Sequence, residues 1–226
     1  MFIVDKMPKS IEAESYRALR TNIQYSSIDK KLKVIVVTSS EPNEGKTTVS
    51  GNIACVLAQN NSKTLLIDCD FRNPNVNKRL GISNENGLSE VLIGNKDKSE
   101  VITRINKNLS ALTTGKIPPN PSEMIGSNTM KELLKSLKDE YDYIIVDTPP
   151  LLVVTDGQLL AANADGTILV VKAEKTKQKQ LMEGKKALEI VKANIIGVVL
   201  NGISKKVNKY YGYYKYEENN KRKRKK

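Results

Sequence analysis

The hydrophobic pattern of the chain is dominated by short apolar runs, each about the length of one strand. Five of them contain consecutive apolar residues instead of an alternating pattern, which is typical of parallel strands buried on both faces. These runs are Leu32–Thr38, Thr64–Asp68, Tyr143–Asp147, Gly166–Lys172 and Ile195–Asn201. Leu109–Thr113 is a sixth candidate strand. We therefore expect a sheet that is largely parallel.

The segments between these runs have the apolar spacing of helices. The longer ones are Ser10–Ile28, with Ser10 as its N-cap, Thr47–Gln59, Thr129–Glu140 and Gln178–Ala193. Residues 72–108 carry Asn-Pro and Asn-Gly turn signals and predict irregular structure with one short helix, Leu88–Ile93; Pro118, Pro119 and Pro121 indicate a rigid loop. The alternation of strands and helices predicts an α/β fold of three layers, with helices on both faces of the sheet.

The composition excludes several kinds of active site. None of the 226 residues is His, which excludes Ser-His-Asp and Cys-His catalysis and the common zinc sites. Cys55 and Cys69 lie inside apolar runs, where buried free thiols are expected. No apolar stretch reaches the ~18 residues of a membrane-spanning helix, and the first ten residues are too short and too charged for a signal peptide. We expect a cytoplasmic protein.

Residues 34–48, VIVVTSSEPNEGKTT, carry the strongest candidate chemistry of the chain. A buried strand runs into a polar turn, and Gly45, Lys46 and Thr47 then open a helix, which is the context of a phosphate-binding loop. Lys46 is expected to reach the β- and γ-phosphates, and Thr47 to bind Mg²⁺. The predicted nucleotide-binding residues here are Ser40, Asn43, Glu44, Gly45, Lys46, Thr47 and Thr48. Ser40 stands where the full pattern has Gly, and the alternative is an ordinary turn with a surface Lys.

Two carboxylates mark the end of the second buried strand. In LLIDCDFR, residues 65–72, alternation along the strand places Asp68 and Asp70 on the same side, and Arg72 follows two residues later. A cation is expected to offset the repulsion between the two carboxylates, and Mg²⁺ suits their hard oxygen atoms. The alternative is a strand that ends in solvent, with Arg72 neutralising one Asp.

Two further polar side chains end buried strands. Asp147 follows three apolar residues in YIIVDTPP, residues 143–150. This is a Walker B position, which binds Mg²⁺ directly or through water. The alternative is an Asp that caps the next turn. Asn201 ends the last strand, where it either hydrogen-bonds a base or begins an Asn-Gly turn. Because a parallel sheet gathers the carboxyl ends of its strands, these residues and the loop are expected to form one site.

Together these motifs resemble the Walker A, A′ and B set of the bacterial tyrosine kinases of capsule and exopolysaccharide synthesis. The matching pattern is Thr38-Ser39-x-x-Pro42-x-x-Gly45-Lys46-Thr47, then Asp68-x-Asp70-x-Arg72, then Asp147-x-x-Pro150. The resemblance covers essentially the whole chain and implies a P-loop NTPase-like fold and an ATP- and Mg²⁺-dependent protein-tyrosine kinase. It implies catalytic roles for Lys46, Asp68, Asp70, Arg72 and Asp147. It also implies that the residues around the Mg²⁺ ion are Thr47, Asp70 and Asp147. Asp68 would lie nearest the attacking hydroxyl.

The same resemblance implies partners. Glu14-x-x-Arg17-x-x-Arg20 matches the family's self-association motif, and these positions lie close to one face of a helix; the alternative is an exposed ion pair within the helix. The implied partners are further copies of the chain in a ring, the cytosolic segment of a membrane-protein activator, a cognate tyrosine phosphatase and other protein substrates. The activator would recruit the kinase from the cytoplasm to the inner face of the membrane.

The C-terminus concentrates both the tyrosines and the net charge. Tyr210, Tyr211, Tyr213, Tyr214 and Tyr216 lie within seven residues. Residues 203–226 hold ten Lys or Arg and two Glu, which is +8 of the total +12. Few aliphatic residues and many charges predict disorder, and we interpret the tyrosines as phosphoacceptors, modified in trans as the resemblance implies. The expected domains are a kinase domain at 1–204, with the self-association helix in 1–30, and a Tyr-rich basic tail at 205–226.

Two other functional classes fit part of the sequence. Related P-loop ATPases position division septa or segregate plasmids, but they carry an additional Lys five residues before the loop Lys, where this chain has Glu41. A nucleic-acid-binding module would account for a basic tail with interleaved Tyr, but no groove or fold motif accompanies the tail. We therefore expect no nucleic acid among the partners.

Overall fold

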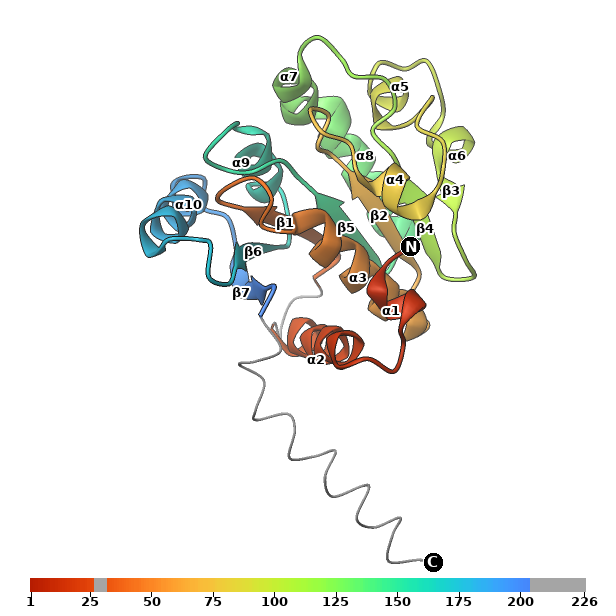
Figure 1. Ribbon diagram of the computed structural model, residues 1–226. Coiled ribbons are helices and arrows are strands. Elements are labelled where there is room, and N and C mark those ends of the chain that lie inside the picture. The colour runs from red at the N-terminus through yellow and green to blue at the C-terminus, as the bar shows by residue number, and fades with distance from the viewer. Residues whose placement is uncertain (27–31, 204–226) are drawn as a thin grey trace, which may run out of the picture.

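The computed structural model describes residues 1–26 and 32–203, and its strands form one sheet (Figure 1). The order is β3-β4-β2-β5-β1-β6-β7, and β3 alone among these strands runs antiparallel to its neighbour. The strands are β1 Val34–Ser39, β2 Thr64–Asp68, β3 Thr103–Arg104, β4 Leu109–Leu112, β5 Tyr143–Asp147, β6 Gly166–Lys172 and β7 Ile195–Asn201. All six predicted strands are confirmed. The predicted tail, 205–226, lies outside the described residues, so its interpretation stays a prediction.

The strand order brings the predicted site residues to one edge of the sheet. β1 pairs with β5 and β6, and β5 pairs in turn with β2. In these registers Val37 lies opposite Asp147, and Asp147 lies opposite Asp68. Every residue of β1 and β2 is buried, which explains why their sequences are apolar at consecutive positions.

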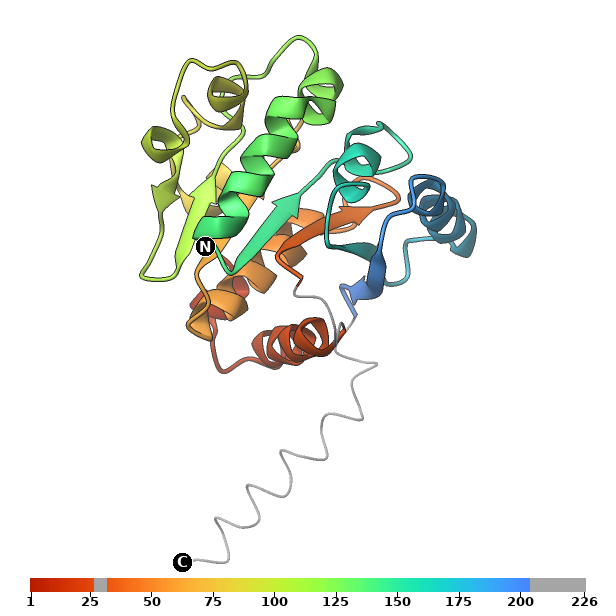
Figure 2. The ribbon, with the colours of Figure 1, turned by 180° about the vertical axis from the view of Figure 1, so that it is seen from behind.

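Helices cover both faces of the sheet, as views from opposite sides show (Figures 1 and 2). On one face α1 (Ile3–Lys6), α2 (Ile11–Tyr25) and α3 (Lys46–Gln59) share a hydrophobic cluster with alternate β1 residues, Ile35 and Val37. The other β1 residues, Val34 and Val36, belong to the opposite cluster. That cluster includes residues of α5 (Leu88–Leu92), α8 (Asn128–Glu140), α9 (Asp156–Ala161) and α10 (Gln178–Ile190). The three-layer α/β prediction is confirmed.

The connections contain more regular structure than the sequence predicted. Residues 72–108, expected to hold one short helix, contain α4 (Val76–Leu80), α5, α6 (Lys98–Val101) and β3. Pro121, assigned to a rigid loop, opens α7 (Pro121–Gly126), because the first helical position needs no N–H and suits the fixed φ of Pro. The helices α1 and α9 were also not predicted. Segments of four to six residues are too short to display a helical period, so the pattern could not reveal them.

The carboxylate of Asp165 joins β1, β6 and α8 where the first two strands begin. Its Oδ2 accepts hydrogen bonds from the backbone N–H of Lys33 at 3.1 Å and of Val34 at 2.8 Å. Its Oδ1 pairs with Nζ of Lys138 at 2.7 Å. Burial alone raises the pKa of Asp165, but these hydrogen bonds outweigh it and hold the pKa below its usual value.

Replacing Asp165 is expected to destabilise the fold in a pH-dependent way. Asp165→Ala removes three charge-assisted hydrogen bonds from a partly exposed group, which should lower the free energy of unfolding by about 1–2 kcal/mol at neutral pH. Because the folded pKa is depressed, this stability is present above the unfolded pKa of about 3.9 and is lost as the pH falls through the folded value. Urea unfolding at pH 7 and at pH 3 measures both effects. Asp139→Ala, an exposed residue of α8, is the control, and an equal loss at both pH values would contradict the assignment.

Candidate active site

The loop between β1 and α3 turns at Gly45, which is the N-cap of α3 with a φ of 99°. Glycine adopts this left-handed conformation without the strain of a side chain. An added Cβ would also lie 2.0 Å from Nδ2 of Asn201, so the position has no room for one. Lys46 is the first residue of α3, with Thr47 and Thr48 behind it. The loop therefore leads into the N-terminus of α3, where free N–H groups and the helix dipole favour an anion. Phosphate binding by these residues stays a prediction.

Ser40, where the full motif has Gly, is accommodated by a glycine elsewhere in the chain. Ser40 is fully buried, and its hydroxyl oxygen has no hydrogen-bond partner. It lies against Gly184 of α10, where an added Cβ would come within 2.3 Å of the Ser40 hydroxyl. The departure at position 40 is therefore matched by the absence of a side chain at position 184. Asn43 is exposed and has a φ of 64°, so it also lies in the tight part of the loop.

Asp68 and Asp147 end the neighbouring strands β2 and β5, and both are buried. The Asp147 side chain hydrogen-bonds to Thr47, but its Oδ1 atom has no hydrogen-bond partner. Burial raises the pKa of Asp147 well above its usual value, and the nearby charge of Asp68 adds to this effect. Thr47 and the Lys46 ammonium act in the opposite direction. A carboxylate in this situation needs a cation beside its free oxygen to remain ionised.

The carboxylate of Asp68 is engaged by the loop that follows β2. Its Oδ1 accepts from the N–H of Asp70 at 3.1 Å, and its Oδ2 from those of Asn75 and Val76 at 3.0 Å each. Burial is the main reason that the pKa of Asp68 is raised. These contacts favour a role in shaping the loop that carries Asp70. The role of Asp68 beside the attacking hydroxyl stays a prediction.

Asp70 is the more accessible carboxylate of the pair. It is half-buried, and its Oδ1 accepts from the N–H of Asn73 at 3.0 Å. Burial raises its pKa, while the Asn73 N–H and the Lys46 charge lower it. Lys46 thus acts on both Asp70 and Asp147, which places its ammonium among the strand-end carboxylates.

Arg72 contacts Asp156, a residue that the sequence pattern did not place in the site. Asp156 opens α9, is fully buried, and accepts a hydrogen bond from the hydroxyl of Ser122 in α7. Nε of Arg72 lies 3.7 Å from Oδ2 of Asp156, and Nη2 of Arg72 donates to Ser122 at 3.4 Å. The alternative was a strand that ends in solvent with Arg72 neutralising one Asp of the pair; instead Asp68 is buried, and Arg72 pairs with Asp156. The only signal in the sequence was a single acidic residue shortly after the apolar run Leu151–Val154.

Asn201 lies against the phosphate-binding loop from the end of β7. Its Nδ2 donates to the carbonyl oxygen of Glu44 at 3.0 Å, next to Gly45. The predicted gathering of loop and strand ends at one edge is thus confirmed for Asn201. Its contact with a base stays a prediction. Glu44 as a whole is only 1% exposed, and its carboxylate accepts hydrogen bonds from other protein groups, so its predicted contact with a nucleotide stays a prediction.

The carboxylates fit a metal ion that is shared with a nucleotide. Among the described residues, no three or more His, Cys, Asp or Glu side chains form a group that could hold a metal by itself. Mg²⁺ in nucleotide sites uses one or two carboxylates and completes its octahedron with phosphates and water. The free Oδ1 of Asp147 and the adjacent Thr47 hydroxyl supply oxygen donors of that kind.

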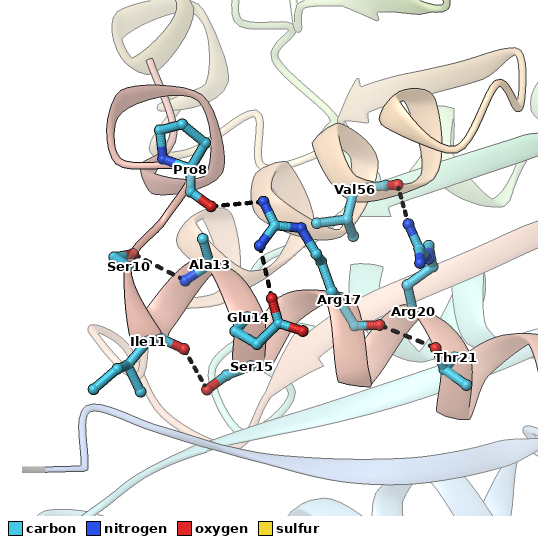
Figure 3. Close-up of polar contacts among 10 residues, drawn as sticks. All are labelled: Pro8, Ser10, Ile11, Ala13, Glu14, Ser15, Arg17, Arg20, Thr21 and Val56. Atoms are coloured by element: carbon cyan, nitrogen blue, oxygen red, sulfur yellow. Dashed lines mark hydrogen bonds and ion pairs between the residues drawn. The ribbon is translucent and has the colours of Figure 1, made fainter. Parts of the chain in front are cut away.

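The predicted self-association motif lies on α2 (Figure 3). Arg17 pairs with Glu14 at 2.8 Å and donates to the carbonyl oxygen of Pro8 at 2.7 Å. Arg20 instead donates to the carbonyl oxygen of Val56 in α3 at 3.4 Å. The intrahelical ion pair of the alternative interpretation therefore exists, and Arg20 is directed towards α3. The role of these residues between copies stays a prediction.

Fold and site together define a P-loop nucleotide-binding protein. A family model described as an AAA domain matches residues 32–196. The chain is 42% identical over 215 residues to tyrosine-protein kinase YwqD of Bacillus subtilis, a match that covers 94% of this chain and 90% of the relative. It is 37% identical to the putative tyrosine-protein kinase CapB of Staphylococcus aureus, with 96% of both chains covered. The kinase domain of Escherichia coli tyrosine kinase ETK matches with a TM-score of 0.87 and 35% identity, over 91% of this chain and 81% of that one.

The chain therefore belongs to the AAA-domain family and to the bacterial tyrosine-protein kinases, and it is a tyrosine-protein kinase. The predicted resemblance is confirmed. The septum site-determining protein MinD of Pyrococcus horikoshii, which represents the alternative class, matches less well, with a TM-score of 0.64 and 26% identity. Among the described residues, no helix has the length and apolarity needed to cross a membrane.

Proposed function

We propose that this kinase transfers the γ-phosphoryl group of ATP to the C-terminal tyrosines, in trans within a ring of identical subunits, with Mg²⁺ as cofactor. The acceptors are Tyr210, Tyr211, Tyr213, Tyr214 and Tyr216. One observation carries the proposal: the last strand, β7, ends at Asn201, which touches the phosphate-binding loop. The chain thus passes the nucleotide site directly before the tyrosine-rich segment begins.

The roles of the residues follow from charge and position. Lys46 and the N–H groups at the start of α3 bind the phosphates and offset the negative charge that moves during transfer. Asp147, Asp70 and Thr47 would hold Mg²⁺, which when bound neutralises phosphate charge. Arg72, oriented by Asp156, adds a cation at the same edge. A loose phosphoryl-transfer transition state needs mainly this positioning and neutralisation, so a strong general base is not required.

The proposal includes the partners of the enzyme. Glu14, Arg17 and Arg20 of α2 contribute to contacts between subunits of the ring. The cytosolic segment of a membrane protein activates the kinase and recruits it from the cytoplasm to the inner face of the membrane. A tyrosine phosphatase reverses the modification, and the kinase also phosphorylates other proteins. This cycle of phosphorylation and dephosphorylation regulates capsular or exopolysaccharide synthesis.

Replacing the five tail tyrosines with Phe tests the acceptor assignment. The variant is expected to lose most phosphotyrosine, while its affinity for Mg·ADP stays within about twofold of the wild type because the nucleotide site is untouched. Mass spectrometry of the full chain after incubation with Mg·ATP measures the first quantity, and calorimetric titration the second. Tyr25→Phe, at a tyrosine that is 79% exposed, is the matched control. Undiminished phosphotyrosine in the five-Phe variant would reject the tail as the main acceptor.

A further inference from the structure

The carboxylate of Glu44 is buried inside the phosphate-binding loop. Only 1% of the residue is exposed, and Oε2 accepts a hydrogen bond from the backbone N–H of Glu41 at 2.9 Å. Oε1 accepts one from the hydroxyl of Thr176, in the connection between β6 and α10. A charged group without water is costly unless hydrogen bonds satisfy it, so both contacts hold the carboxylate in place.

The hydroxyl of Thr176 makes two hydrogen bonds at once. It accepts from the backbone N–H of Lys172 at 2.8 Å and donates to Glu44. The N–H of Thr176 also bonds the carbonyl oxygen of Lys172 at 3.0 Å, so the turn that carries the hydroxyl is itself closed. A side-chain hydroxyl both donates and accepts. Ser can therefore replace Thr176 in this arrangement, whereas Val, which has the same shape, cannot.

The same part of the fold touches the loop at two more points. Nδ2 of Asn201 donates to the carbonyl oxygen of Glu44, and Gly184 of α10 lies against Ser40. The C-terminal third of the chain thus contacts the loop at Ser40 and at Glu44. The Thr176 contact differs from the other two because it fixes a buried charge through a short polar side chain.

We propose that Thr176 is a positioning residue for nucleotide binding and acts through Glu44. Glu44 directly precedes Gly45, where the left-handed turn directs the chain into α3. Anchoring the Glu44 side chain fixes this turn, and with it the direction of the N–H groups that receive phosphate. Without the Thr176 hydroxyl, binding itself has to order the loop, and the affinity falls accordingly.

Thr176→Val should therefore raise the Kd for Mg·ADP and the KM for ATP about tenfold, the scale set by one hydrogen bond to a buried charge. The kcat should stay within about twofold, because the loop regains its conformation once the nucleotide is bound. Thr176→Ser keeps the hydroxyl and should restore both constants to within about twofold of the wild type. Calorimetric titration of the full chain with Mg·ADP gives the Kd, and phosphotyrosine formation gives KM and kcat.

A double-mutant test separates this role from general destabilisation. In a Glu44→Ala background, Thr176→Val should cause no further loss of affinity, because Thr176 acts through Glu44. Thr129→Val, at an exposed residue of α8, is the control and should leave the Kd unchanged. Wild-type affinity in Thr176→Val, failure of Ser to rescue, or a further tenfold loss in the Glu44→Ala background would overturn the inference. The inference rests on the proposed nucleotide, and that proposal would fail separately if the wild type did not bind Mg·ADP.

Discussion

Lys46→Met is expected to abolish tyrosine phosphorylation while the protein stays folded. Lys46 is 8% exposed at the first turn of α3, and its charge acts on Asp70 and Asp147. Met has a similar unbranched stem, so the packing of the side chain is largely kept while the charge is lost. Removing one group that stabilises transition-state charge costs about 100-fold or more in rate, roughly 2.7 kcal/mol. We expect at least this loss, measured as phosphotyrosine per subunit by mass spectrometry.

The control for this substitution is Lys131→Met, at an exposed position of α8 that is not among the predicted site residues. It should retain full activity, which would exclude an effect of removing any one positive charge. Thermal unfolding should show both variants folded at the assay temperature. Phosphotyrosine at the wild-type level in Lys46→Met would reject the loop between β1 and α3 as the nucleotide site.

Asp147→Asn should separate catalysis from stability. The substitution removes the charge that we expect to hold Mg²⁺, and the rate at saturating ATP should fall about 100-fold or more. Burial, aided by Asp68, raises the pKa of Asp147 in the folded state above its unfolded value. Because the folded pKa is raised, the free energy of unfolding of the wild type falls as the pH rises through the folded pKa. The amide of Asn does not ionise, so the variant does not lose this stability. The nucleotide-free variant should therefore unfold at a higher temperature than the wild type.

Thermal unfolding without Mg·ADP measures the stability of the nucleotide-free variant, and unfolding with Mg·ADP measures how much the nucleotide stabilises it. A ligand that binds the folded state raises the melting temperature more when it binds more tightly, so Mg·ADP should stabilise the wild type more than Asp147→Asn. Asp139→Asn, at an exposed residue of α8, should change neither quantity. A variant that is less stable without nucleotide, or fully active with it, would contradict the role given to Asp147.

The sheet edge that forms the site could be predicted from the sequence because its signals are local. Consecutive apolar residues identified the strands, and the polar residues that follow them, Asp68, Asp147 and Asn201, were expected at one edge. The structure pairs Asp68 with Asp147 in register and places Asn201 beside Gly45. Parallel topology alone makes this convergence necessary, so no long-range contact had to be guessed.

The parts that could not be predicted depend on contacts between distant segments. Glu44 and Thr176 are separated by 132 positions and meet because β6 pairs with β1. Arg72 and Asp156 meet only through the placement of the short helices α7 and α9, which show no helical period of their own. Arg20 has the helical spacing of an exposed motif, yet the packing of α2 on α3 directs it to Val56.

The central claim is that the P-loop site of one subunit phosphorylates the tail of another, and mixing two inactive variants tests it most directly. Lys46→Met keeps the tail tyrosines and lacks the catalytic charge, whereas the five-Phe variant keeps the site and lacks the acceptors. The two are produced together, with different tags, in the natural host without its own copy, and the tail of Lys46→Met is examined by mass spectrometry. We predict phosphate on those tyrosines when the partner is present and none when Lys46→Met is produced alone. An unmodified tail in the mixture, under conditions where the wild type is phosphorylated, would contradict the account.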